Sequence, residues 1–407
     1  MELCPTGPLY LEVGNGIQSV VERLSQKTTS RATSAIDSVV LRGRFCRFID
    51  THVSPDEIND VLRMASCLPN LRRLCFLRMR VPVSAITDIL HVASRSGIGG
   101  GLNLLEELEL RSIVLSGSLE DMRDLGFALE QHTTLKKIAL ADCRPESSES
   151  MGHEINMNEN HYLDSVITAL GKMVSLTQVE FDMMELSRWL QSTTSFQKFI
   201  SGGHLKRLSL SYMRVPEDYI LSMADALSCH DPLSSVEEVC FDRCDSLSKQ
   251  STFVMSEMLR RNTSLTKLKL VVKDYDDAIP IAQALTYNTC SGLKHLFLRT
   301  YSHLHNSIGH NVYQAFKTML EHNFTIEYLE MFQGHPMRPI LALDPALNFY
   351  LKINRAGRNK LLSLQRQSIS TEASNDEWAR VIIASRLDVQ CTYYFLSQNP
   401  SICQVSY

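Results

Sequence analysis

The sequence lacks any hydrophobic run as long as a membrane span, which takes about 20 consecutive apolar residues. It also lacks the basic start and the long apolar segment of a signal peptide, because it begins Met1-Glu2-Leu3-Cys4-Pro5. We therefore expect no membrane association and a location in the cytoplasm or the nucleus.

A large excess of charge is also missing, since 41 Lys and Arg residues oppose 45 Asp and Glu residues, for a formal net charge of −4. Such a chain has no general attraction to nucleic acid. The 11 cysteines contain no Cys-x-x-Cys pair. In a chain without a secretion signal, we expect them to be reduced thiols.

Local signatures of catalysis are absent, because no G-x-S-x-G, H-E-x-x-H or Walker-type motif occurs. The glycine run at residues 97–101 follows a predicted helix and precedes a predicted strand. This order is the reverse of that in a phosphate loop, so we interpret the run as a turn. His303, His305 and His310 lack the further carboxylate or thiolate of a metal site. We expect no enzyme activity, no cofactor and no metal.

A repeated frame, Leu-x-x-Leu-x-Leu, organises the chain and is clearest at residues 265–270. Its apolar offsets fit one face of a short strand, and one such strand cannot bury that face alone. The frame therefore predicts stacked copies. Ten copies occur at intervals of 28 to 41 residues, starting at Ile36, Leu71, Leu105, Leu135, Leu176, Leu205, Val236, Leu265, Leu293 and Ile326.

Helix signals lie between the frames. Residues 54–57, Ser-Pro-Asp-Glu, combine a capping serine with proline at the first helical position. Ser118 and Asp121 repeat this cap with the shorter acid, and Pro216 and Asp276 precede further apolar residues at helical spacing. Each repeat is therefore predicted to be one strand followed by one helix.

This pattern resembles the leucine-rich-repeat family, in its ribonuclease-inhibitor-like subclass. The resemblance covers residues 31–340 and rests on frames such as Leu105–Leu110, Leu135–Leu140 and Leu205–Leu210. It implies an α/β solenoid, or horseshoe, with a parallel sheet on the concave face and helices on the convex face.

The turn signature of the family is sparse in this chain. The family usually has Asn or Cys three residues after the last strand leucine, and only Cys143 and Cys244 fit. We interpret the other residues at this position as a sign of irregular turns. Asn262 and Asn323 begin glycosylation sequons just before two frames, and we interpret them as turn residues.

Both ends of the array are predicted to be capped. Residues 1–30 form the N-terminal cap, residues 31–340 the array of about ten units, and residues 341–407 a helical C-terminal cap.

The C-terminal cap is predicted to begin with a helix at Pro345. Trp378, Tyr394 and Phe395 should cover the last apolar layer of the array. This tail resembles those of uncharacterised microalgal repeat proteins, which implies no activity.

The architecture predicts a monomeric, non-catalytic scaffold or adaptor that holds a protein partner, and two alternatives stay open. Some proteins of this repeat class activate the GTPase Ran, and this chain is similar to them in fold alone. Leu387, Cys391 and Phe395 faintly resemble the elongin-binding box of ubiquitin-ligase adaptors. Because such helical spacing is common, we prefer a plain capping helix.

The binding surface is predicted from strand alternation, because offsets 2, 4 and 6 of each frame point away from the core. The first seven copies carry mixed polar residues there, which we interpret as a solvated face. The last three copies differ, since aromatic and basic residues interleave as in protein-binding hot spots. The candidate residues are Lys267, Lys269, His295, Phe297, Arg299, Tyr328 and Phe332.

Overall fold

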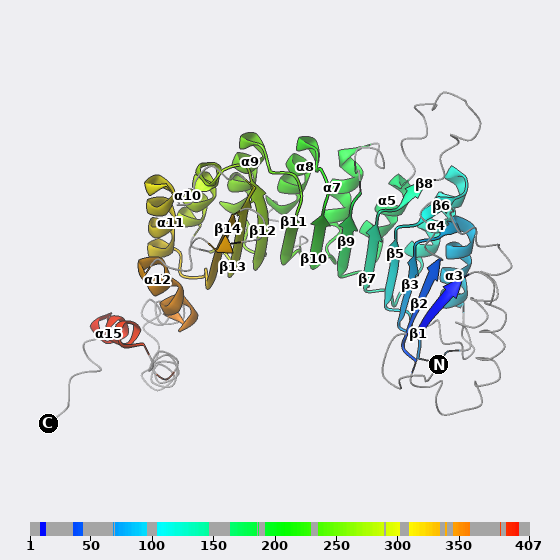
Figure 1. Cartoon of the computed structure of the whole chain (residues 1–407), viewed down its shortest axis with the longest axis horizontal. Coiled ribbons are helices and arrows are strands. Elements are labelled where there is room, and N and C mark those ends of the chain that lie inside the picture. The colour runs from blue at the N-terminus through cyan, green and yellow to red at the C-terminus, as the bar shows by residue number, and fades with distance from the viewer. Residues whose placement is uncertain are drawn as a thin grey trace. The chain divides into compact units, whose positions relative to one another are not determined.

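The computed structural model of the chain consists of two compact units, each with parallel strands on one side and helices on the other (Figure 1). Unit 1 comprises Met1–Leu227, Asp231–Val236 and Phe241–Asp245. Unit 2 comprises Ser228–His230, Glu237–Cys240 and Ser246–Tyr407. The structure describes residues 9–13, 36–43, 68, 70–95, 104–145, 163–184, 186, 192–228, 235–288, 290–301, 309–333, 338–339, 345–358, 383 and 388–398.

The main sheet of unit 1 has the strand order β1-β2-β3-β5-β7-β9-β10, with parallel neighbours throughout. The first strand, in the segment predicted to be the N-terminal cap, pairs with β2. The strands are β1 Leu9–Val13, β2 Ser38–Gly43, β3 Arg73–Leu77, β5 Glu107–Arg111, β7 Lys137–Ala141, β9 Gln178–Asp182 and β10 Arg207–Ser211.

The helices of unit 1 are α3 Val83–Arg95, α4 Leu119–Glu130, α5 Asp164–Lys172, α7 Thr193–Ser201 and α8 Glu217–Ser228. Helix α4 begins as the sequence predicts. The Ser118 hydroxyl accepts the Asp121 N–H at 3.2 Å, and the Asp121 carboxylate accepts the Ser118 N–H at 2.6 Å. A second, small parallel sheet joins β4 Arg80–Pro82, β6 Val114–Ser116 and β8 Arg144–Pro145.

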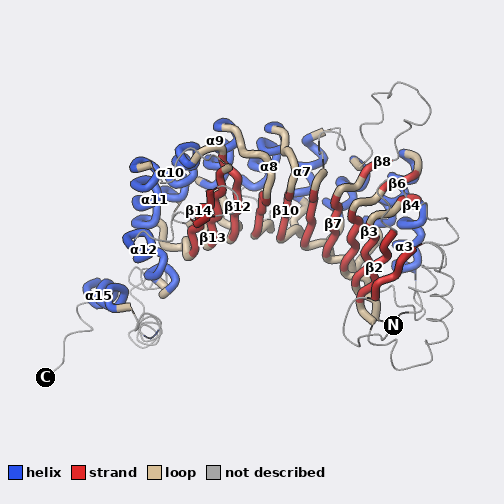
Figure 2. The backbone as a smooth tube through the Cα atoms, viewed as in Figure 1, coloured by secondary structure: helices blue, strands red, loops and turns tan. Residues whose placement is uncertain are grey.

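Unit 2 continues the same alternation, as the red strands and blue helices of Figure 2 show. Strand β11 is divided between the units, and its residues Glu238–Cys240 pair with β12. Strands β12, β13 and β14 are parallel, and β15 returns antiparallel to β14. The elements are β11 Glu238–Asp242, α9 Lys249–Leu259, β12 Lys267–Val272, the 3-10 helix η5 Tyr275–Ala278, α10 Ile279–Tyr287, β13 His295–Thr300, α11 His310–His322, β14 Tyr328–Gln333, β15 Arg338–Pro339, α12 Pro345–Arg355 and α15 Val389–Gln398.

The repeat frame is confirmed, because a strand begins two residues after every one of the ten frame starts. All ten starting residues are buried, and the strand leucines stack in register. Leu268 of β12 faces Leu296 of β13, and both are 0% exposed. The chain is therefore an α/β leucine-rich-repeat solenoid with its core between the sheet and the helices.

The turns after β3, β5, β7, β9, β10 and β11 each pass through a residue with positive φ, so the prediction of irregular turns is wrong there. After the first five of these strands, the N–H of that residue donates to the next strand; the Ser112 N–H, for example, donates to the Ala141 carbonyl at 2.7 Å. Cys143 fills its turn as predicted, because its Sγ donates to the Leu110 carbonyl at 3.3 Å. The positive-φ residues are Arg78, Ser112, Asp142, Met183, Tyr212 and Arg243.

Buried asparagines secure the entry to the unit 2 strands. The Asn262 side chain accepts the Leu265 N–H at 2.8 Å, and the Asn323 side chain accepts the Ile326 N–H at 3.2 Å. Asn288 reaches back to the Leu259 carbonyl at 2.7 Å. The interpretation of Asn262 and Asn323 as turn residues is confirmed.

Helix α12 closes unit 2 through the same kind of contact. Asn354 donates to the Ile326 carbonyl at 2.9 Å. Arg358, just beyond the helix, donates to the carbonyls of Leu320 and Glu321 at the end of α11, at 3.2 and 3.0 Å. Because these carbonyls lack partners within α11, Arg358 satisfies them and fixes α12 beside α11.

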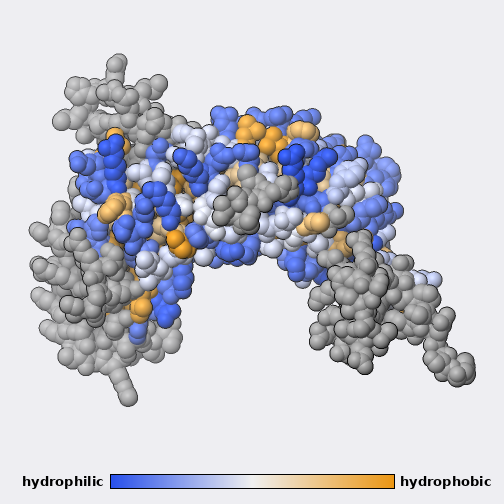
Figure 3. All heavy atoms as spheres, turned by 180° about the vertical axis from the view of Figure 1, so that it is seen from behind, coloured by the Kyte–Doolittle hydropathy of each residue, from blue (hydrophilic) through white to orange (hydrophobic). Residues whose placement is uncertain are grey.

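The face of the molecule seen in Figure 3 is mostly hydrophilic, with hydrophobic side chains in a few small groups. No helix within the described ranges is long and apolar enough to cross a membrane. Several expected features lie outside the described residues: the helix after residue 54, the glycine run, His303, His305 and Trp378.

Candidate functional site

The residues predicted to bind a partner lie on β12, β13 and β14 of unit 2, where strand register groups them into three rows. Lys269 and Phe297 are half-buried, as is Phe332. The rows are Lys267–His295–Tyr328, Lys269–Phe297–Glu330 and Val271–Arg299–Phe332.

Aromatic rings stack across the first two rows. The His295 and Tyr328 ring centres are 4.5 Å apart and their planes differ by 4°. The His295 and Phe297 rings are 6.3 Å apart and nearly parallel, at 7°. Tyr328 is 39% exposed, so this layer of rings reaches solvent.

Cations border the stacked rings. Lys267 Nζ lies 5.9 Å from the centre of the Phe297 ring and 3.7 Å from a carboxylate oxygen of Glu238. Arg355 of α12 places its guanidinium carbon 5.2 Å from the centre of the Tyr328 ring. Sequence reasoning missed Arg355, because the residue lies outside the strand frames from which the binding surface was predicted. We name the set Lys267, Lys269, His295, Phe297, Tyr328 and Arg355 the aromatic patch; Tyr328 and Arg355 are exposed and the other four are half-buried.

Arg299 does not belong to this patch, and its prediction as an exposed residue is wrong. It is 1% exposed, with its guanidinium carbon 4.6 Å from the Tyr301 ring centre. The Tyr275 hydroxyl, from η5 after β12, donates to the Phe332 carbonyl on β14 at 2.6 Å. Because β13 lies between these strands, this bond spans the end of β13 that carries Arg299.

The sheet face of unit 1 was predicted to be solvated, and its central row is instead buried. Glu109 is 1% exposed. Its carboxylate forms ion pairs with the side-chain nitrogens of Arg73 and Arg111, each at 2.8 Å, and of Lys137 at 3.8 Å. Burial alone would raise the pKa of Glu109, but the Arg111 hydrogen bond and the three positive charges outweigh burial and lower it. The buried row is Val40, Cys75, Glu109 and Ala139.

In the segment that resembles an elongin-binding box, Cys391 makes its contacts within the chain, whereas Leu387 and the side chain of Phe395 lie outside the described residues. Cys391 of α15 is 1% exposed and packs with Ile353 of α12. Tyr394 likewise packs on α12, 6.0 Å from Phe349. Tyr394 therefore contacts α12, where the sequence predicted contact with the last strand. Beside it lies a groove of about 690 Å³ between α12 and α15.

In the part of the chain that the structure describes, no group of three or more His, Cys, Asp or Glu side chains is placed to hold a metal ion. Cys240 and Cys244, four residues apart, have different environments: Cys240 is half-buried on β11, whereas the Cys244 Sγ donates to the Leu210 carbonyl at 3.2 Å.

No family model matches the sequence, and no curated protein matches it. Among solved structures, the chain is similar to a Bacteroides fragilis protein, with 9% identity and a TM-score of 0.40 over 70% of this chain and 73% of that one. It is also similar to the leucine-rich repeat-containing protein LegL7 from Legionella pneumophila, with 10% identity and a TM-score of 0.38 over 86% and 91% of the two chains. A third likeness is to TLR13 in its complex with ssRNA13, with 13% identity and a TM-score of 0.37. It covers 75% of this chain, which spans only 34% of the TLR13 chain.

Proposed function

We propose that the aromatic patch of unit 2 binds a protein, and that the chain is a monomeric, non-catalytic scaffold or adaptor. The observation that carries this proposal is the stack of His295, Phe297 and Tyr328, which reaches solvent at Tyr328 and is bordered by Lys267 and Arg355. Aromatic and cationic side chains of this kind are enriched in hot spots of protein interfaces. Because the rings already pack on one another, ordering them on binding costs little entropy.

The charges in the patch favour a protein over a nucleic acid. Stacked rings and cations can also hold single-stranded nucleic acid. Here, however, Glu330 is the register partner of Phe297, and Glu238 pairs with Lys267. Carboxylates in these positions would repel a phosphate backbone.

The proposal also includes the repeat subclass, the likeness of the C-terminal tail and the location of the protein. The alternation of strands and α-helices in the described repeats supports the ribonuclease-inhibitor-like subclass. The tail's likeness to microalgal repeat proteins involves the segment that forms α12. Location in the cytoplasm or nucleus is supported by Cys143 and Cys244, which act as buried thiol donors. Burial raises the pKa of Cys143 to about 12, so it stays protonated.

Neither alternative function has a specific observation in its favour. Regulation of a small GTPase rests on fold alone. The ubiquitin-ligase adaptor needs a box helix that presents Cys391 to its partner, and the burial of Cys391 against α12 counts against this role.

A quantitative affinity capture tests the proposal. The full chain, immobilised as wild type, would be compared with the double variant His295→Ala/Tyr328→Ala. The matched control is Phe253→Ala/Tyr287→Ala, which removes two aromatic side chains from α9 and α10, 50% and 72% exposed. Captured proteins would be quantified by mass spectrometry.

A genuine partner should be retained by wild type and by the control, and should be lost from the patch variant. The expected loss of affinity is at least tenfold, or about 1.4 kcal/mol, which is typical of one hot-spot residue. Equal capture by all three proteins, or loss only from the control, would place binding elsewhere. Accelerated GTP hydrolysis by a captured GTPase would favour the regulatory alternative.

A further inference from the structure

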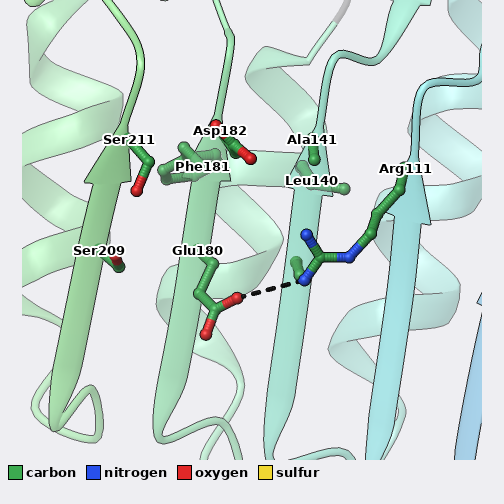
Figure 4. Close-up of a pocket in the computed structure, with 9 residues that line it drawn as sticks. Arg111, Leu140, Ala141, Glu180, Phe181, Asp182, Ser209 and Ser211 are labelled. Carbon is green, nitrogen blue, oxygen red and sulfur yellow. Dashed lines mark ion pairs between the residues drawn. The ribbon is translucent and has the colours of Figure 1, made fainter. Parts of the chain in front are cut away.

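The sheet face of unit 1 carries a pocket of about 240 Å³ around two acidic side chains of β9 (Figure 4). Glu180 has Ala139 on one neighbouring strand and Ser209 on the other. Asp182 is flanked in the same way, by Ala141 and Ser211. Because adjacent strands are about 4.8 Å apart, these small neighbours leave an open space beside each carboxylate.

One of the two carboxylates is already neutralised. Glu180 pairs with Lys137 at 3.1 Å and with Arg111 at 3.6 Å, the contact drawn in Figure 4. The ion-pair cluster beside the pocket balances three cations against three carboxylates: Arg73, Arg111 and Lys137 against Glu107, Glu109 and Glu180.

Asp182, the other carboxylate in the pocket, takes no part in this ion-pair cluster. Within the described residues it has no ion pair, and its Oδ1 atom is buried without a hydrogen-bond partner. Burial raises the pKa of Asp182, whereas the charge of Arg111 and a hydrogen bond from the Met183 backbone N–H lower it; with the charges of Asp142 and Glu180, the net direction is upward. Because Arg111 forms its ion pairs with Glu109 and Glu180, the charge of Asp182 is only partly compensated, and its place in a pocket suggests that an external cation would stabilise it.

We propose that this pocket binds the side chain of an arginine or lysine from a partner protein. The cationic group would lie beside Asp182 and donate to its carboxylate, with the Ser209 and Ser211 hydroxyls as further acceptors. Glu180 lies two residues from Asp182 on the same face, about 6.6 Å along the strand, but Lys137 and Arg111 already neutralise it, so the attraction comes from Asp182. A flat polar surface would not select such a side chain, because only a recess removes both charges from water.

This site is separate from the aromatic patch, and it stands whether or not the patch binds a protein. Its residues all belong to unit 1, whereas the patch belongs to unit 2. The two proposals can therefore fail independently.

Peptide selection on the full chain tests the pocket. Random heptapeptides displayed on phage would be selected against immobilised wild-type protein, and enriched sequences would be resynthesised with a fluorescent label. Dissociation constants would be measured by anisotropy for wild type, for Asp182→Asn and for Asp142→Asn. Asn at position 182 keeps the shape of the side chain and removes its charge. Asp142 is a matched control, because it is a neighbouring carboxylate that pairs with Arg144 at 2.8 Å and does not line the pocket.

The enriched peptides should share one arginine or lysine. Replacing that residue with glutamine, or Asp182 with Asn, should each weaken binding at least tenfold, whereas Asp142→Asn should change it less than threefold. Melting of Asp182→Asn should be unchanged or higher, because an unpaired carboxylate is removed. Failure to enrich basic peptides, binding that is indifferent to Asp182→Asn, or complete displacement of the peptide by equimolar spermidine would overturn the proposal. Spermidine displacement would identify the ligand as a free polyamine.

Discussion

Mild acid should loosen unit 1 at His132, which is 3% exposed in the turn between α4 and β7. Its Nδ1 accepts the Leu135 N–H at 3.2 Å, so the ring is neutral and carries its proton on Nε2. Nε2 is buried, with no hydrogen-bond partner in the described structure. Burial lowers the pKa of His132 to about 4.

The sign of the effect follows from proton uptake. Between the unfolded pKa of about 6.5 and the folded value, the unfolded chain binds a proton that the folded chain does not. Stability therefore falls as pH falls through this window. From pH 7 to pH 5 the loss is about 2 kcal/mol, or a roughly 30-fold drop in protection against local opening.

The assay is hydrogen exchange by mass spectrometry on peptides from α4 and β7, because repeat arrays need not unfold in one step. The matched variant is His132→Asn, since Asn262 makes the equivalent bond to the Leu265 N–H without a titrating group. Protection in the variant should be nearly the same at pH 7 and pH 5, once intrinsic exchange rates are corrected. A wild-type protein with no loss of protection at pH 5, or a variant as acid-sensitive as wild type, would refute the reasoning.

Three further outcomes are expected, each read by thermal melting or exchange. Leu268→Asp places an unpaired carboxylate in the core, at a cost of several kcal/mol, and should abolish cooperative melting of unit 2; unchanged melting would contradict the stacked-repeat core. Gly202→Ala should destabilise unit 1, because an added Cβ would lie 2.1 Å from the Gly171 carbonyl oxygen. The control is Gly309→Ala, which should melt like wild type because its added Cβ would have its nearest contact at 3.9 Å. Arg358→Lys cannot reproduce both bonds to the end of α11, so exchange in α11 and α12 should quicken, and unchanged exchange would show that Arg358 does not hold the cap.

Regular features of the array could be predicted from the sequence because they depend on near neighbours. The frame predicts where every repeat strand begins, and the capping residue Ser118 predicts where α4 begins. The left-handed turns could not be predicted in this way. Residues such as Arg78 and Met183 occupy them in place of glycine, and the hydrogen bond to the next strand holds the conformation.

Burial on the sheet face was harder to predict, because it depends on residues from different repeats. Glu109 is enclosed by cations from three strands. Arg299 is buried with its guanidinium over the ring of Tyr301, a residue outside the strand frame. The pocket at Asp182, however, left a usable signal. Aligned frames place alanine and serine at matching offsets on both sides of β9, so small neighbours around an acidic residue could have been found from the sequence.

Site-specific photocross-linking tests most directly the claim that the sheet face of unit 2 binds a protein. A photoreactive phenylalanine derivative would replace Lys269 on β12 in one protein and Tyr287 on α10 in another, each mixed with the captured partner. Lys269 lies among the stacked rings, whereas Tyr287 is 72% exposed on the helix layer. The partner should cross-link from position 269 and not from position 287. Cross-linking from position 287 alone, or equally from both, would contradict the assignment of the binding surface.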